Sequence, residues 1–133
     1  MSKEKEVEGQ VNHFSVGNVT PIFRMFDVEK AREFYLEYLG FTTVFEHRFG
    51  DVCPLYMGLQ RDGCSLHLSE HHGDANPGSS IRVEVSNIDS FHAAVTSHPY
   101  RYAKPEIEHQ PWGSREVSVN DPFGNRIVFF QTP

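Results

Sequence analysis

The chain has 133 residues, which is enough for one domain with a single core and too few for two independent enzyme domains. Its 18 acidic side chains outnumber the 12 lysines and arginines, and the net charge of −6 disfavours nucleic acid and anionic lipid as partners and favours cationic ones. Because the sequence has no apolar run of about 18 residues and no apolar signal core near its start, we expect it in the cytoplasm.

The first half of the chain is predicted to contain one helix among several strands. Charged residues and glycine interrupt any period in residues 1–17, so we expect a flexible N-terminal segment there. The clearest element is a helix over residues 28–39, which Asp27 can cap and which Gly40 can end. Strands are predicted before and after this helix, over residues 19–25, 41–49, 54–60 and 64–69.

A loop leads from this half into a second one with the same order of elements. Residues 71–79 are rich in Gly, Pro, Asn and Asp and are expected to form a hinge. Beyond the hinge, Asn87 can cap a helix over residues 88–97, and the turn 121–125 joins the last two strands. The strands of this half are predicted over residues 81–85, 106–109, 115–119 and 126–130.

The repeated order predicts two structural units within one domain. Each half places a capping residue before its helix and a glycine in the turn of its last hairpin. We therefore expect an α+β domain of residues 18–133, built from module one at 18–70 and module two at 80–131.

Four short stretches carry a family resemblance. They are residues 21–23 (PIF), residues 34–35 (FY) with 39–41 (LGF), residues 110–113 (QPWG) and residues 121–125 (DPFGN). In these stretches the chain resembles the bleomycin-binding resistance proteins of the vicinal oxygen chelate superfamily, which also contains the glyoxalases. The resemblance covers about residues 19–130 and implies two βαβββ modules that form a half-open mixed β-sheet cup.

In the metalloenzymes of this superfamily, four inward side chains hold one divalent metal. The matched positions in this chain are Thr20, His67, Ser80 and Val128. Only His67 is a strong ligand type, whereas Zn²⁺, Ni²⁺ or Fe²⁺ needs three or four His, Glu, Asp or Cys side chains. We therefore expect no metal, no other cofactor and no catalytic residue. The alternatives are a glyoxalase-, lyase- or dioxygenase-like enzyme acting on a small substrate, and a ligand sensor or assembly module.

Alternation along the strands predicts which side chains line the cup. If His67 points inward, its apolar neighbours Leu66 and Leu68 point toward the helices. The cup face then carries Arg24, Ser65, His67, Ser69, Arg82, Glu84 and Arg126. Glu84 could form an acid–base pair with His67, or an ordinary ion pair with Arg82 or Arg126.

Trp112 is the only tryptophan, and it sits between Pro111 and Gly113 among polar neighbours. In the resembled proteins the corresponding Trp stacks on the flat bithiazole of the drug, with a Phe matching Phe49 on the other side and one matching Phe45 nearby. Plain packing of Trp112 is the alternative. The predicted ligand-binding residues are Trp112, Phe49, Phe45, His67, Ser65, Arg82, Glu84 and Gly113.

The resemblance also implies a function and a partner. It predicts non-catalytic binding and sequestration of a bleomycin-type cationic glycopeptide antibiotic, which confers resistance. In the resembled family the binding clefts are built from both subunits of a homodimer. Pro21 matches the strand position at which the N-terminal arm of that family crosses to the partner.

Overall fold

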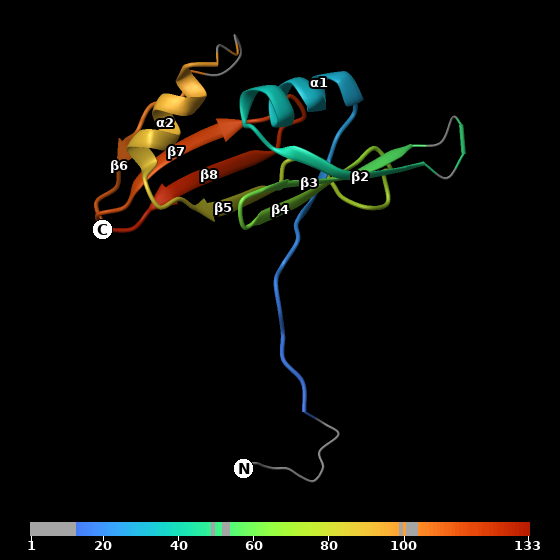
Figure 1. Ribbon diagram of the computed structural model, residues 1–133, viewed down its shortest axis with the longest axis horizontal. Helices are drawn as coiled ribbons and strands as arrows, with labels where there is room; N and C mark the ends of the chain where they lie inside the picture. The colour runs from blue at the N-terminus through green and yellow to red at the C-terminus, as the bar shows by residue number, and fades with distance from the viewer. Residues whose placement is uncertain (1–12, 49, 52–53, 99, 101–103) are drawn as a thin grey trace.

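The fold consists of two four-stranded sheets with helices on one side (Figure 1). The computed structural model describes residues 13–48, 50–51, 54–98, 100 and 104–133. The first sheet has the strand order β1-β4-β3-β2, with β1 (Ile22–Arg24), β2 (Thr42–Arg48), β3 (Leu55–Arg61) and β4 (Cys64–Ser69). The second has the order β5-β8-β7-β6, with β5 (Ser80–Glu84), β6 (Glu108–His109), β7 (Arg115–Asn120) and β8 (Arg126–Gln131).

Each sheet has the same mixed pairing. In each, the first strand pairs in parallel with the last strand of its module, and the other neighbours are antiparallel. A helix follows the first strand in both modules, as a parallel crossover requires. The predicted α+β class and the repeated βαβββ order are therefore confirmed.

The first helix departs from the prediction in its second half. Asp27 caps α1 (Val28–Arg32) by accepting the Lys30 amide at 3.0 Å, and the helix then continues as a π-helix, η2 (Glu33–Tyr38). The single α-helix predicted over residues 28–39 is thus wrong from Glu33 onward. In η2 the Leu39 amide donates to the Phe34 carbonyl at 2.9 Å, five residues back. The wider turn lets a dense aromatic stretch face the core, where Phe34, Tyr35, Tyr38 and Leu39 are all buried.

The second helix, α2 (Ile88–Thr96), follows the prediction closely. The side chain of Asn87 accepts the Ser90 amide at 3.1 Å, which satisfies one of the free amides of the first turn. Ile88 and Val95 are buried beneath the helix, while Phe91 packs against Phe129 with ring centroids 4.3 Å apart. Among the described residues, no helix has the length and apolarity needed to cross a membrane.

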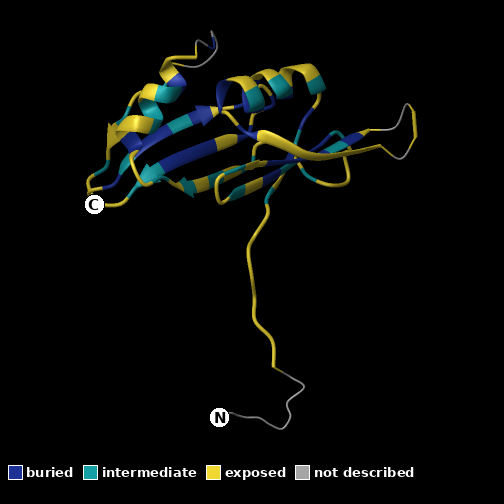
Figure 2. Ribbon diagram, viewed as in Figure 1, coloured by how far each residue is buried: buried dark blue, intermediate teal, exposed yellow. Residues whose placement is uncertain are grey.

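The N-terminal arm, residues 13–21, leaves the domain as an extended segment instead of forming the start of a strand (Figure 1). The predicted strand over 19–25 is therefore shortened to β1, because Val19 and Thr20 pair with no strand among the described residues. The exposed face of the arm is evident in Figure 2, and it includes Phe14, Val16 and Val19.

The alternation predicted for the cup strands is confirmed by burial. Leu66 and Leu68 on β4 and Ile127 and Phe129 on β8 are buried on the helix side of the sheets. Because paired residues share a face, Phe23 lies on the same side as its partner Leu68. The opposite face of each sheet is the cup face.

A buried polar network ties the two modules together. The Tyr35 hydroxyl donates to Asp121 at 2.6 Å, and Asp121 also accepts the backbone amides of Phe123 and Asn125. The side-chain amide of Asn125 donates to the Arg24 carbonyl at 2.8 Å. Burial, together with the charge of Asp121, raises the pKa of Tyr35 well above its usual value. The neutral phenol therefore holds the carboxylate of module two against module one.

Candidate functional site

Three rings gather on the cup face of the first sheet. Phe45 on β2 and His67 on β4 both pair with Gly58 on β3, the strand between them, and Tyr56 lies two residues before Gly58 on that strand. The ring of Phe45 lies nearly parallel to that of Tyr56 with centroids 6.1 Å apart, and meets His67 edge to face at 5.2 Å. The structure thus brings together the predicted site residues Phe45 and His67.

The Phe45 ring lies directly on the backbone of Gly58. A Cβ atom at this glycine would fall 2.1 Å from the ring, a distance that no packed pair of atoms tolerates. Phe45 nevertheless remains 42% exposed, because its other face is open. It therefore offers a flat apolar surface that a planar ligand can cover.

Tyr56 is a site residue that the sequence analysis missed. Its hydroxyl lies 2.7 Å from Nδ1 of His67, so the two side chains share a hydrogen bond. Burial raises the pKa of Tyr56, and the negative charge of Asp74 raises it further. Tyr56 could have been predicted from the register of the hairpin that turns at Asp62 and Gly63. This register places Tyr56 diagonally across from His67 on the same face of the sheet.

The cup face of the second sheet centres on a buried carboxylate, Glu116, which the sequence analysis also missed. Glu116 is only 7% exposed and accepts Arg82 Nη2 at 3.0 Å and the Ser114 hydroxyl at 3.2 Å. The amide of Gln110 reaches its other oxygen at 3.5 Å. The guanidinium of Arg82 lies 4.3 Å above the ring of Phe130. The sequence of β7 held a signal for Glu116. Val117 and Val119 point to the helix side of the sheet, so Glu116, directly before Val117, must point to the cup face.

The structure supports neither of the two pairings considered for Glu84, with His67 or with Arg82 or Arg126. Among the described residues, Glu84 makes no ion pair and no hydrogen bond to His67; Arg82 instead binds Glu116, and Arg126 reaches the Ser118 hydroxyl at 3.3 Å. The physical reason is sheet geometry. Through Phe130 on β8, Glu116 lies opposite Glu84 and diagonally opposite Arg82, so the guanidinium of Arg82 reaches the buried carboxylate of Glu116 and Glu84 remains exposed.

Trp112 occupies a tight turn between β6 and β7. The Gly113 amide donates to the Gln110 carbonyl at 2.9 Å, and Gly113 has a φ of 97°, which favours glycine. Trp112 is 65% exposed, so the alternative of plain core packing is wrong. Because Gln110 and Ser114 both reach Glu116, the buried carboxylate anchors the turn that carries the indole.

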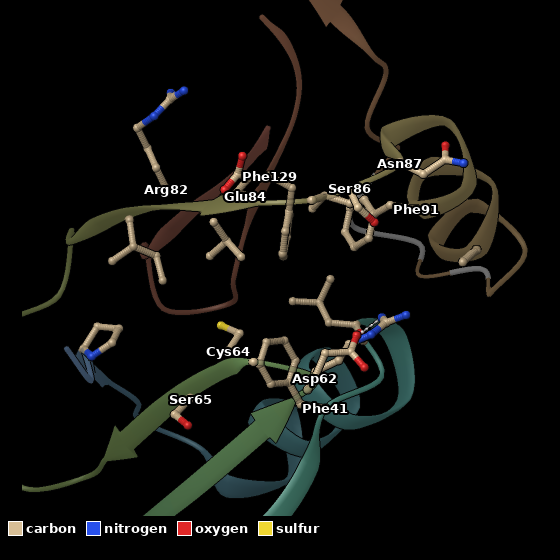
Figure 3. Close-up of a pocket in the computed structure, with 18 of the residues that line it drawn as sticks. Phe41, Asp62, Cys64, Ser65, Arg82, Glu84, Ser86, Asn87, Phe91 and Phe129 are labelled. Atoms are coloured by element: carbon tan, nitrogen blue, oxygen red, sulfur yellow. Dashed lines mark hydrogen bonds between the residues drawn. The ribbon is translucent and has the colours of Figure 1, made fainter. Parts of the chain in front are cut away.

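A cleft of about 970 Å³ opens between the modules (Figure 3). Phe41 and Cys64 line it from module one, and Phe91 and Phe129 line it from module two. Its lining also includes three of the predicted ligand-binding residues, Ser65, Arg82 and Glu84, and Figure 3 shows the side chains of Arg82 and Glu84 pointing away from its apolar interior.

The predicted ligand-binding residues therefore fall into three places. Phe45, His67 and Ser65 lie on the first sheet, and Arg82 and Glu84 lie on β5 of the second. Trp112 and Gly113 lie in the turn before β7, and Phe49 lies outside the described residues.

The side chains at the four matched metal positions do not suit a transition metal. Thr20, Ser80 and Val128 supply no imidazole, thiolate or carboxylate to join His67. Across the part of the chain that the structure describes, no three His, Cys, Asp or Glu side chains converge on a point where a metal could bind.

Fold and site together define a family. The chain matches the model of the glyoxalase superfamily proteins over residues 4–132, and it therefore belongs to that superfamily.

Its relatives include proteins that act in drug resistance. A bleomycin resistance protein of Geobacillus stearothermophilus is 26% identical over 129 residues, covering 84% of this chain and 93% of the relative. The bleomycin-binding protein of Streptomyces verticillus, solved with copper(II)-bleomycin, is 28% identical with a TM-score of 0.66, covering 91% of this chain and 99% of that one. A second bleomycin-binding protein, solved with bleomycin, has 25% identity and a TM-score of 0.68, covering 89% and 100%.

Proposed function

We propose that this protein binds and sequesters a flat, cationic glycopeptide antibiotic of the bleomycin type and leaves it chemically unchanged. The observation that carries the proposal is the exposure of Trp112, a large apolar ring held at the tip of a tight turn. An exposed indole offers a large flat apolar face on which a planar ligand can stack. The relatives solved with bleomycin supply the class of ligand.

The charge of the chain supports a cationic ligand. Its net charge of −6 attracts a positively charged tail over several ångströms. On the cup side of β5, Glu84 is exposed and has no ion pair among the described residues, so it can face such a tail. Glu116 is already neutralised by Arg82 and contributes less.

A fluorescence titration tests the proposal directly. Trp112 is the only indole, so bleomycin should quench or shift its emission, with saturation at one ligand per chain. The same ligand should raise the melting temperature by mass action. An unchanged emission and melting temperature at high micromolar bleomycin would contradict the proposal and leave only the superfamily assignment. Cell fractionation would test the expected cytoplasmic location.

We further propose a homodimer in which the N-terminal arm packs on a second copy. Three apolar side chains of the arm are exposed, Phe14, Val16 and Val19. Pro21 at the base of the arm lacks the backbone amide that would extend β1 toward the N-terminus. The cleft between the modules presents apolar walls that a second copy can cover. Burial of both surfaces gives association its driving force.

Light scattering at micromolar concentration should give the mass of a dimer. A Phe14→Asp, Val16→Asp double variant places charges on the apolar positions of the arm and should give a monomer. Ser15→Asp adds a charge to the same arm at a polar position and serves as the matched control. A monomeric parent protein would contradict the proposal.

A further inference from the structure

We propose that Tyr56 fixes the protonation pattern of His67, so that the His67 Nε2–H and the Phe45 ring form a subsite for an uncharged planar group bearing a carbonyl oxygen. The first part concerns the chain alone. The second part deepens the proposed function and rests on one element of it, the binding of a small ligand on the cup face.

The hydrogen bond between the two side chains decides where the imidazole proton lies. Tyr56 Oη and His67 Nδ1 are 2.7 Å apart, so one proton lies between them. A phenol is a better donor than a neutral imidazole, and an imidazole nitrogen is a better acceptor than a phenol oxygen, so Tyr56 donates. A neutral imidazole carries a single N–H, which must then be on Nε2.

The surroundings of Tyr56 keep its hydroxyl available as a donor. Burial and the nearby charge of Asp74 raise its pKa, so the phenol holds its proton across the physiological range. Asp74 itself is engaged by the Ser69 hydroxyl at 2.7 Å and does not compete for the Tyr56 proton in the structure. The tether also limits rotation of the His67 ring, because Nδ1 is held at a defined place.

The Nε2 side of His67 is left open for a ligand. None of the described residues forms a hydrogen bond to Nε2, and the ring is only partly buried. Among the described strand residues, the other charged or titratable groups on this face are Arg24 on β1 and His47 on β2, and Asp74 lies beside Ser69 at its end. The guanidinium of Arg24 lies 4.5 Å above the ring of Phe26.

These features specify the chemistry of the ligand group. A single neutral N–H matches one carbonyl oxygen, whereas a carboxylate would meet repulsion from a chain of charge −6. Phe45 rests on Gly58 and is still 42% exposed, and its exposed surface favours a flat group beside that oxygen. An aromatic or conjugated amide satisfies both requirements.

Nitrogen NMR of the ligand-free protein tests the role of Tyr56. With His67 neutral, we expect Nε2 protonated and Nδ1 unprotonated, with the Nδ1 resonance shifted by the hydrogen bond that it accepts. Tyr56→Phe should move that resonance to the position of an unbonded ring nitrogen. Tyr38→Phe is the matched control, because the Tyr38 hydroxyl is buried and has no hydrogen-bond partner in the structure.

Fragment titrations test the ligand chemistry with two probes of similar size, benzamide and aniline. Benzamide carries the carbonyl oxygen and aniline does not, so benzamide should bind about three- to tenfold more tightly, the effect of one hydrogen bond. It should shift the resonances of His67 and Phe45. Both His67→Phe and Tyr56→Phe should reduce this preference, and Tyr38→Phe should leave it unchanged.

The outcomes separate this inference from the proposed function. A proton on Nδ1 of His67, or an Nδ1 resonance unaffected by Tyr56→Phe, would overturn the role of Tyr56, whether or not bleomycin binds. Equal affinity for benzamide and aniline would overturn the ligand assignment. If both parts hold while bleomycin leaves Trp112 unchanged, the proposed function fails and the subsite stands.

Discussion

Two turns of module two share one sequence pattern but differ in the burial of their aromatic side chain. Residues 110–114 read Gln-Pro-Trp-Gly-Ser, and residues 121–125 read Asp-Pro-Phe-Gly-Asn. In both, the glycine has a positive φ, 97° in the first and 91° in the second. In both, the first residue donates its amide to the carbonyl of the fifth at 2.8 Å. The backbone is therefore the same while the aromatic side chain differs in its surroundings.

The difference lies in what packs over each turn. Phe123 is buried and meets the ring of Phe26 edge to face at 6.2 Å, and Asp121 is bound by Tyr35 of module one. Trp112 is mostly exposed, and among the described residues the side chains of its turn form hydrogen bonds to Glu116 of the same sheet and none to module one. One turn thus holds the modules together, and the other presents its aromatic ring to solvent.

Truncating the buried aromatic should have the largest effect. Phe123→Ala removes a ring from the junction between modules and should destabilise the fold by about 3 kcal/mol. Chemical denaturation would measure this as a lower midpoint. A loss below about 1 kcal/mol would mean that the turn at residues 121–125 is no more structural than the turn at 110–114.

Removing the hydroxyl that joins the modules should come next. Tyr35→Phe deletes the bond to Asp121 and should cost about 1.5–3 kcal/mol, as for other bonds to charged groups. It should also alter the response to alkali. Because the folded pKa of Tyr35 is raised, the unfolded chain loses this proton first, and stability from Tyr35 is complete below about pH 10 and falls as the pH rises further.

Unfolding midpoints measured from pH 8 to pH 11 would show this dependence. The parent protein should lose stability above pH 10, and Tyr35→Phe should lose less over the same interval. Tyr38→Phe removes a second buried hydroxyl that has no hydrogen-bond partner among the described residues. Because burial alone raises the pKa of Tyr38, this variant measures the pH dependence that a buried tyrosine has without Asp121. Parallel curves for the parent and Tyr35→Phe would contradict the assignment.

The two glycines give a finer comparison. A Cβ at Gly124 would meet no atom within 4 Å, so Gly124→Ala should cost only the backbone penalty of a positive φ, about 1–2 kcal/mol. A Cβ at Gly113 would also lie 3.1 Å from Pro133. Thermal unfolding should therefore show Gly113→Ala to be slightly more destabilising, and the reverse order would refute a contact between Pro133 and this turn.

Truncating the exposed aromatic should affect binding alone. Trp112→Ala should weaken bleomycin binding by about tenfold, near the upper value of about 1.5 kcal/mol for aromatic stacking, with little change in the melting temperature. Calorimetry is the suitable measurement, because the variant has no indole to report. Val44→Ala removes another exposed apolar side chain and should change neither quantity. Full affinity in Trp112→Ala would place the ligand elsewhere.

Local patterns were enough to predict most of the fold. Capping by Asp27 and Asn87, and alternation of apolar residues along the strands, gave both helix starts and the cup face. The π-helical half of the first helix was missed because the apolar spacing of an α-helix and of a π-helix overlap in so short a stretch. Only the packed core selects between them.

The site was harder to predict, because its contacts cross strands. Tyr56 and His67 are eleven residues apart and meet only through the register of a hairpin. Glu116 and Arg82 are 34 residues apart and meet across β8. Trp112 was correctly identified as a candidate for exposure by its polar neighbours. The ion pair considered for Glu84 is absent because proximity along a strand says nothing about which carboxylate is buried beside an arginine.

The glycine at position 58 limits how the binding specificity of this protein can evolve. The Phe45 ring occupies the space that a β-carbon would fill, so the two positions cannot vary independently. A mutation that enlarges residue 58 must displace the ring and deepen, tilt or close the apolar surface beside His67. The residue at position 58 therefore sets the shape of this apolar surface, and one substitution there would change it.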